Sequence, residues 1–320
     1  MKLLATGAAG FIGANFVHYT RRHHPEYEVV VLDALTYAGN RESLKPVEDQ
    51  IEFVHGDICD AELVDRLVKD ADVVVHFAAE SHVDNSLHDP APFVQTNLIG
   101  TYTILEAIRK HGGRLDHIST DEVFGDLDLD GDDQFTEDTP YDPSSPYSAT
   151  KAGSDLLVRA WARSFGIHAT MSNCANNYGP YQHPEKLIPR FVTNLLDGRT
   201  VPLYGEGAQI RDWVHVDDHC RGLALVLTEG TPGETYHIGG DAELTNRDLT
   251  GRLLALCHAG PDRIVQVPDR KGHDFRYALD DDKIRQKLGY RPRTDFETGL
   301  AATVDWYRDN PEWWRPLVID

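Results

Sequence analysis

The sequence has few of the features that mark secreted, membrane-embedded or metal-rich proteins. Its 320 residues include only four cysteines, and no two of them have a C-x-x-C spacing. Such scattered cysteines are typical of reduced thiols in a cytoplasmic protein. The longest apolar run, residues 73–79, is too short to span a bilayer, and the N-terminal residues resemble a strand that enters a turn more than a signal peptide. We therefore expect a cytoplasmic protein with no membrane contact.

Basic residues are also scarce relative to acidic ones. The chain has 31 lysines and arginines against 52 aspartates and glutamates, which gives a formal net charge of −21. Such a surface repels phosphate backbones, so nucleic acid is not an expected partner. An anionic ligand would need a local group of cations. The length suits one large domain or two closely joined ones.

Short apolar runs alternate with helical periodicity through the first half of the chain. The expected strands are 2–6, 28–32, 51–55, 73–77, 115–120 and 168–173. The expected helices are 11–22, 61–67, 94–110 and 147–165, with a later one at 188–196. This alternation indicates an α/β fold with a doubly wound parallel sheet of the Rossmann type. The loop-rich texture after residue 176 indicates a smaller, interleaved C-terminal lobe.

A glycine-rich turn with G-x-x-G-x-x-G spacing, residues 7–13, follows the first expected strand and opens a helix. Glycines there allow backbone N–H groups to approach a pyrophosphate, which the helix N-terminus favours. Asp33 ends the next strand, where a carboxylate can accept a ribose 2′-hydroxyl, and no arginine follows it to hold a 2′-phosphate. NAD is therefore favoured over NADP. Asp57 and Ile58 are placed to flank the adenine, although a plain turn aspartate is the competing interpretation.

Tyr147 and Lys151 form a Y-x-x-x-K pair in an expected helix, for which Ser145 is the candidate N-cap and Pro146 the first residue. Residues four apart project from the same face of a helix. A nearby ammonium favours the phenolate, so we expect Lys151 to lower the pKa of Tyr147 and make it a base. Lys151 is also placed to bind the nicotinamide ribose.

Thr120, Asp121 and Glu122 stand at the carboxyl end of an expected parallel strand, where ligands bind in open α/β sheets. Removal of a hydride from an alcohol does not need two extra carboxyls. Proton removal from carbon and protonation of a leaving hydroxyl do need them. With Asp121 as acid and Glu122 as base, the pattern predicts oxidation followed by elimination of water. A solvated strand end is the competing interpretation.

These motifs and their surroundings resemble the dTDP-glucose 4,6-dehydratase family of the extended short-chain dehydrogenase/reductase superfamily. The resemblance covers nearly the whole chain, through residues 6–13, 32–40, 76–84, 119–123, 145–151, 176–189 and 269–274. It implies that Tyr147, assisted by Thr120, takes the C4 hydroxyl proton while NAD accepts the C4 hydride. It further implies that Glu122 removes the C5 proton, that Asp121 protonates the departing C6 hydroxyl, and that the hydride returns to C6.

The turn and the resemblance together define two sets of binding residues. The expected NAD residues are Gly7, Gly10, Phe11, Ile12, Gly13, Asp33, Ala34, Leu35, Thr36, Asp57, Ile58, Phe77, Ala78, Ala79, Glu80, Ser81, Thr96, Tyr147, Lys151 and Asn177. The expected substrate residues are Ser81, Thr120, Asn176, Lys186, Leu187, Pro202, Leu203, Tyr204, Arg211, Asn246, Asp269, Arg270, Lys271, Gly272 and His273. Among them, Lys186, Arg211 and Arg270 supply cations for a diphosphate.

The change of texture after residue 176 divides the chain, and the resemblance implies ligands for the two parts and a partner. Residues 1–175 plus about 215–240 are expected to bind NAD, and about 176–214 plus 241–320 are expected to bind dTDP-glucose. A homodimer through the helices at 94–110 and 147–165 is implied as well. Two departures concern structure: Ala8 replaces a frequent glycine, which the turn tolerates if φ stays negative, and Asn173 replaces a frequent arginine.

Two segments look like metal sites. Residues 126–137 match the calcium-loop spacing D-x-D-x-D-G-x5-E, but a strand precedes them where that motif requires a helix. His215 and His219 are four apart, with Asp217 between them as the expected helix cap. We expect no metal at either place.

Two alternatives to the dehydratase remain open on the sequence. An epimerase or decarboxylase would share the Tyr147 and Lys151 chemistry. A non-catalytic NAD-sensing regulator would share the fold, but it would need neither this pair nor the two carboxyls.

Overall fold

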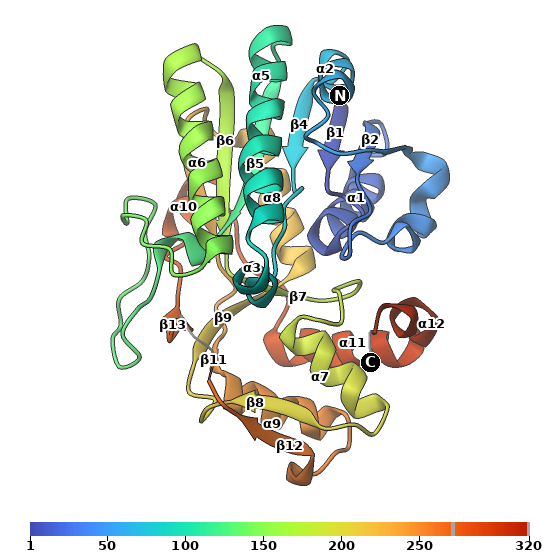
Figure 1. The fold of residues 1–320 in the computed structure, drawn as a ribbon, viewed down its shortest axis with the longest axis vertical. Helices are drawn as coiled ribbons and strands as arrows, with labels where there is room; N and C mark the ends of the chain where they lie inside the picture. Colours follow the sequence, from blue (N-terminus) through green and yellow to red (C-terminus); the bar gives the residue numbers. More distant parts are fainter. Residues whose placement is uncertain (270–272, 319–320) are drawn as a thin grey trace.

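A parallel seven-stranded sheet forms the larger part of the molecule. In the computed structural model, which describes residues 1–269 and 273–318, the strand order is β10-β6-β5-β4-β1-β2-β3 (Figure 1). The strands are β1 (Lys2–Thr6), β2 (Glu28–Asp33), β3 (Glu52–His55), β4 (Val73–His76), β5 (Arg114–Thr120), β6 (His168–Cys174) and β10 (Thr235–Ile238). The first six lie where the sequence predicts them, and the doubly wound α/β class is confirmed.

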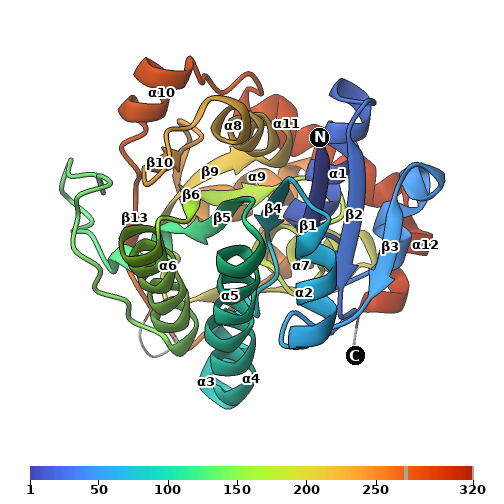
Figure 2. The same ribbon diagram turned by 90° about the horizontal axis from the view of Figure 1, so that it is seen from above.

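Helices cover both faces of this sheet (Figure 2). The bounds are α1 (Phe11–His23) and α8 (Val216–Glu229) on one face, and α2 (Ala61–Lys69), α5 (Thr101–His111) and α6 (Pro146–Phe165) on the other. Alternate residues of β2 serve the two faces: Val29 and Val31 join the core under α1 and α8, whereas Val30 and Leu32 join the core under α2 and α5. No helix within the described residues is long and apolar enough to cross a bilayer.

The predicted helix at 94–110 is confirmed, but its first half is a π-helix. A short helix α4 (Ala91–Phe93) leads into a π-helix, Val94–Gly100, before α5 begins. A side chain at Gly100 would place its Cβ 2.3 Å from Ile58, so the helix and this loop make a close contact. The π-helix also turns the buried Asn97 towards Glu80 and Thr150. Side-chain periodicity alone does not reveal such a π-bulge.

The second lobe packs around its own apolar core below the carboxyl ends of the sheet (Figure 1). Its strands are β7 (Asn176–Tyr178), β8 (Val201–Tyr204), β9 (Ile210–His215), β11 (Glu243–Thr245), β12 (Ile264–Val267) and β13 (Arg276–Tyr277). Its helices are α7 (Leu187–Leu196), α9 (Asn246–Leu256), α11 (Phe296–Asp309) and α12 (Pro311–Trp314). β9 pairs with β7, β11 and β13 and so holds the lobe together.

The remaining elements are short connections and one returning helix. They are the helix α3 (Val83–His88), the 3₁₀ segments Arg41–Gln50, Asp121–Phe124, Pro261–Arg263 and Arg315–Leu317, and α10 (Asp282–Leu288). α10 packs against β10 and α8, where Ile284 joins the core of the larger sheet. The chain therefore returns to the sheet near its C-terminal end.

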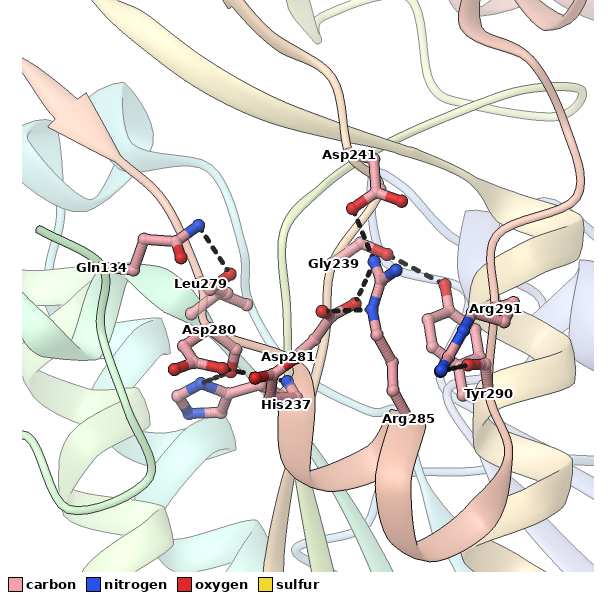
Figure 3. A network of polar contacts seen from close by, with 12 residues as sticks. Gln134, His237, Gly239, Asp241, Leu279, Asp280, Asp281, Arg285, Tyr290 and Arg291 are labelled. Atoms are coloured by element: carbon pink, nitrogen blue, oxygen red, sulfur yellow. Dashed lines mark hydrogen bonds and ion pairs between the residues drawn. The ribbon is translucent and has the colours of Figure 1, made fainter. Parts of the chain in front are cut away.

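An acidic network fixes the start of α10 (Figure 3). The guanidinium of Arg285 donates to Asp281 (2.5 and 2.9 Å) and to Asp241 (2.5 Å). Asp212, whose pKa burial raises to about 6, accepts backbone N–H groups from Gly240 and Ala242 at the same place. Arg285 is thus a cation that compensates several clustered carboxylates.

Replacing Arg285 with glutamine is expected to lower the free energy of unfolding by about 2 kcal/mol at pH 7.5, because Asp281 would keep a buried charge without its partner. Burial already raises the pKa of Asp281, and loss of the cation raises it further. The destabilisation is therefore full above that pKa and shrinks as the pH falls through it. Urea unfolding at pH 7.5 and at a series of lower pH values measures both the loss and its pH dependence. A loss that stays constant down to the lowest pH at which the wild type remains folded would contradict this account.

Candidate active site

One cavity of about 440 Å³ collects most of the predicted site residues at the carboxyl ends of the parallel strands, between the sheet and the second lobe. The predicted cofactor residues that line it are Gly7, Gly10, Phe11, Ile12, Gly13, Asp33, Ala34, Thr36, Asp57, Ile58, Phe77, Ala78, Ala79, Glu80, Ser81, Thr96, Tyr147, Lys151 and Asn177. The predicted catalytic and substrate residues that line it are Thr120, Asp121, Glu122, Asn176, Lys186, Leu187, Pro202, Leu203, Tyr204, Arg211, Asn246 and His273.

Two predicted residues do not line the cavity. Leu35 has a positive φ of 51° and contributes its backbone N–H to the Asp33 carboxylate (2.8 Å). Asp269 accepts from the Gln209 amide (2.8 Å) and lies 2.6 Å from a ring nitrogen of His273, so it orients a wall of the cavity from behind. The predicted substrate residues Arg270, Lys271 and Gly272 lie outside the described residues.

The cavity also has lining residues that the sequence did not single out. They are Leu32, Ala38, Gly39, Gly56, His82, Val83, Asp84, Ile118, Ser119, Cys174, Ala175, Gln182, His183, Glu185, Ile188, Arg190, Phe191 and Trp213. Several of them are neighbours in sequence of predicted residues. Their position at the end of a strand was the feature of the sequence that could have identified them. Phe191 and Trp213 reach the cavity only through the folding of the lobe.

The glycine turn at the start of α1 packs so closely against the protein that two of its glycines leave no room for a Cβ. A Cβ at Gly7, where φ is +69°, would lie 2.4 Å from Ala78, and one at Gly13 would lie 2.6 Å from Ala8. Gly10 is the N-cap of α1 and provides no side-chain cap, and the first turn has no acidic residue. Ala8 does not adopt a positive φ, as its replacement of glycine requires. Backbone N–H groups at a helix N-terminus of this kind bind pyrophosphate.

Asp33 is held in place at the carboxyl end of β2. Its two oxygens accept the N–H groups of Ala9 and Leu35, each at 2.8 Å. Burial raises the pKa of Asp33, and these two hydrogen bonds oppose that shift. A Cβ at Gly39 would lie 2.7 Å from the Asp33 carboxylate, so this position in the neighbouring loop must be glycine. The carboxylate fits a ribose hydroxyl, and the residues of this cavity therefore fit NAD.

Helix α6 presents Tyr147 and Lys151 from one face. The predicted cap is confirmed, because Ser145 accepts from Ser148 and Pro146 begins the helix. The expected effect of Lys151 on Tyr147 is wrong: burial raises the pKa of Tyr147 well above its usual value, and Glu122 raises it further. The Lys151 ammonium donates instead to the carbonyl of Ile118 at 2.7 Å. A hydrogen bond from Thr120 opposes the rise for Tyr147.

The two carboxyls differ in their surroundings. Asp121 is 2% exposed, and burial together with the neighbouring Glu122 raises its pKa well above the usual range, which favours the protonated form. One of its oxygens accepts from the Thr120 hydroxyl at 3.1 Å, and the other has no hydrogen-bond partner within the described residues. Glu122 is only half-buried. A buried acid beside a more accessible carboxyl is the division that elimination requires.

Strand β6 supports this strand end from below. Asn173 is fully buried and donates to the carbonyl of Thr120 at 2.9 Å. The shorter side chain that replaces a frequent arginine therefore keeps a polar contact beneath the site.

The expected diphosphate cations make contacts within the protein. Arg211, 6% exposed, donates to the carbonyls of Ile210, Phe275 and Asp274, and its guanidinium lies over the ring of Tyr277. Lys186 donates to the carbonyl of Ser81 at 2.6 Å. Both side chains line the cavity.

The two motifs that resemble metal sites have structural roles. The Asp126 carboxylate accepts from the N–H groups of Phe275 (2.6 Å) and Arg276 (3.0 Å), and Glu137 accepts from that of His237 (3.2 Å). The predicted cap at Asp217 is wrong, because His215 is the N-cap of α8. Across residues 1–269 and 273–318, no group of three or more His, Cys, Asp or Glu side chains is arranged to hold a metal ion.

A Rossmann sheet, a tyrosine–lysine pair on one helix and a second lobe over the same cavity define an extended short-chain dehydrogenase/reductase. Comparison with known proteins identifies a narrower family within this class. Residues 4–303 match the family described as GDP-mannose 4,6 dehydratase. The dTDP-glucose 4,6-dehydratase of Mycobacterium tuberculosis H37Rv is 61% identical over 318 residues, which cover 99% of this chain and 96% of the relative. That of Escherichia coli K12 (dTDP-glucose 4,6-dehydratase 1) is 48% identical over 341 residues, with coverage of 98% and 94%.

Solved structures agree with these relatives. The dTDP-glucose 4,6-dehydratase of Streptomyces venezuelae, solved with NAD and TYD bound, has 56% identity and a TM-score of 0.96, with coverage of 99% and 100%. A UDP-glucose 4-epimerase of Thermus thermophilus, solved with NAD, has 30% identity and a TM-score of 0.90, with coverage of 97% and 100%. The chain belongs to the dTDP-glucose 4,6-dehydratase family.

Proposed function

We propose that this chain is a hydro-lyase that converts dTDP-glucose into dTDP-4-keto-6-deoxyglucose for deoxysugar biosynthesis, with NAD as a recycled cofactor. One observation carries the proposal: the cavity that fits NAD also holds Tyr147, hydrogen-bonded to Thr120, beside a buried acid and a more accessible carboxyl. The family relatives at 48–61% identity support the same activity.

Oxidation at C4 comes first. NAD, when bound, would supply the hydride acceptor for C4 and the hydride donor for C6, and its nicotinamide ring would add positive charge to the cavity. Tyr147 takes the C4 hydroxyl proton as a phenolate, and a hydrogen bond from the Thr120 hydroxyl favours that phenolate before the transfer. Because burial raises the pKa of Tyr147, formation of the phenolate needs positive charge in the cavity.

Loss of water follows from the C4 ketone. The ketone makes the C5 proton acidic, and Glu122 is the carboxyl placed to remove it and to give a proton back to C5 when the hydride returns to C6. Asp121, whose pKa is raised by burial, gives its proton to the departing C6 hydroxyl. Its second oxygen, which has no partner in the described part of the chain, is available for that hydroxyl. An epimerase would need no such acid, and a regulator would need none of these groups.

Mass spectrometry of dTDP-glucose after incubation with the purified protein tests the proposal. Loss of one water, with NAD retained and no added oxidant, is the expected result. An unchanged mass in a protein that carries NAD would reject this substrate and favour the epimerase, decarboxylase or regulator. Other sugar nucleotides in the same assay separate those cases.

The nucleotide sugar is proposed to lie across the second lobe. Asn176 and Asn246 line the cavity, and their side-chain oxygens are buried without a partner among the described residues, so they are available to a ligand. The division of the chain into an NAD part and a nucleotide-sugar part stays a prediction, and a cytoplasmic location is proposed with it. The charge of −21 gives no support for nucleic acid as a partner.

A homodimer is proposed through the π-helix Val94–Gly100, α5 and α6. Large apolar side chains are exposed on these elements: Val94, Ile99, Tyr102, Leu156 and Phe165 are each 44–54% exposed. An apolar group of this size on one face is typical of a protein interface. In a dimer with a two-fold axis, these helices of one copy would pack against the same helices of the other copy.

Replacing Leu156 with glutamate is expected to convert the dimer into monomers, because each interface would then bury two charges without partners. Light scattering coupled to gel filtration measures the mass. Val265→Glu, at a similarly exposed residue of β12, is the matched control and should leave the mass unchanged. A dimeric Leu156→Glu variant would place the interface elsewhere.

A further inference from the structure

Asp155 on α6 is a fully buried carboxylate outside the residues that perform the proposed chemistry. It is 0% exposed, and it accepts three hydrogen bonds, from His117 (2.9 Å), Ser119 (2.7 Å) and Tyr141 (3.0 Å). These donors hold the pKa of Asp155 below its usual value in spite of the burial. A buried ionised group costs stability unless it is paired, so its retention calls for a role.

The position of Asp155 relates it to the catalytic pair. Tyr147, Lys151 and Asp155 are spaced four apart and lie along one face of α6. His117 and Ser119 are alternate residues of β5 and point to the same side of the sheet. Lys151 donates to the carbonyl of Ile118, which lies between them. Three successive residues of β5 are therefore tied to two successive turns of α6.

The strand that is tied in this way carries the acid and the base. β5 ends at Thr120, and Asp121 and Glu122 follow directly. The relative height of α6 and β5 thus sets the distance between the Tyr147 hydroxyl and Thr120. A shift of one element along the other would change that distance, while the cofactor turn, which belongs to β1 and α1, would stay in place.

Asp155 also faces the buried charge of Lys151. Lys151 is 5% exposed, burial lowers its pKa, and Asp155 is the strongest influence that raises it. The other titratable groups near Lys151 and Asp155 are His117 on β5, Cys174 on β6, His76 on β4 and Tyr141 on the loop before α6. Burial lowers the pKa values of both histidines and raises the pKa of the Cys174 thiol.

We propose that Asp155 is a positioning residue, whose buried carboxylate locks α6 to β5 through His117 and Ser119 and is the counter-charge of the Lys151 ammonium. It does not touch substrate or cofactor. It holds Lys151 on Ile118 and thereby keeps Tyr147 in register with Thr120. The role rests on the proposed dehydratase function.

The test compares two isosteric substitutions of buried carboxyls on neighbouring elements. Asp155→Asn removes the charge and places an amide N–H2 group opposite side chains that themselves donate hydrogen bonds to Asp155. Asp116→Asn is the matched control: Asp116 is equally buried, its pKa is raised to about 7, and it bonds to Thr170 on the far side of β5. Both proteins are assayed for water loss from dTDP-glucose across pH, with thermal unfolding in parallel.

Asp155→Asn is expected to lower kcat by about 10²-fold with little change in KM, as a misplacement near 1 Å would do. The alkaline limb of its pH profile should move about one unit lower, because Lys151 loses its counter-charge. Asp116→Asn should retain the wild-type rate and profile. Ser119→Ala, which removes one link and keeps the charge, should lower kcat by several-fold with no shift of the profile.

Several results would overturn the positioning role. They are a wild-type kcat in Asp155→Asn, an equal fall in Asp116→Asn, or a fall in kcat with an unmoved alkaline limb. If Asp155→Asn does not fold, a wild-type kcat in Ser119→Ala overturns it instead. Failure of the wild type to act on dTDP-glucose would reject the proposed function but not the positioning role. That role can be tested without substrate, because a crystal structure of Asp155→Asn shows whether Lys151 has moved away from Ile118.

Discussion

Replacing Tyr147 with phenylalanine is expected to lower kcat for water loss from dTDP-glucose by about 10³-fold, which lies within the range for removal of a general base. The substitution deletes only the hydroxyl that takes the C4 proton. Tyr147 is 7% exposed and already packs edge-on against Phe93, so the phenyl ring keeps its place and the fold is retained. Steady-state kinetics measured by mass spectrometry gives the rate, and KM should change much less than kcat.

Tyr236→Phe is the matched control for that experiment. Tyr236 is a buried tyrosine of β10 whose hydroxyl accepts from the N–H of Thr231 at 3.0 Å, away from the cavity. Its substitution should leave kcat at the wild-type value. A Tyr147→Phe enzyme with more than a tenth of the wild-type kcat would show that another group takes the C4 proton.

Replacing Glu122 with glutamine is expected to separate the two halves of the reaction. Oxidation at C4 should continue slowly, because Tyr147 and Thr120 are untouched, while water loss should fall by about 10³-fold for want of a base at C5. In deuterated water the wild-type product should carry deuterium at C5, whereas the variant should leave the C5 hydrogen of recovered dTDP-glucose unexchanged. Mass spectrometry of substrate and product measures both quantities.

Glu137→Gln provides the corresponding control, since Glu137 is a partly buried glutamate that accepts from the N–H of His237 and does not line the cavity. Full water loss by Glu122→Gln would refute its assignment as the base. A complete loss of C4 oxidation in the same variant would place Glu122 in the first step and not the second.

The Rossmann class and the catalytic group could be predicted because their signals are local. Tyr147 and Lys151 share a face of α6 whatever the rest of the fold does, and Thr120, Asp121 and Glu122 follow a strand whose apolar pattern is short and clear. The glycine spacing before α1 is likewise a local signal, because it reflects the conformation of a single turn. The weaker predictions were those about the lobe, whose short strands pair across long separations in sequence.

The sequence by itself therefore determined six strands of the sheet, the cofactor turn and the catalytic residues on β5 and α6, because periodicity and spacing act within a few turns of chain, whereas the substrate residues of the lobe came from the family resemblance. Only the tertiary structure decided what those residues do to one another. It directs Lys151 to Ile118, raises the pKa of Tyr147 by burial, bends 94–100 into a π-helix and places Asp155 against β5. These outcomes depend on desolvation and on contacts between distant segments, which no local pattern encodes.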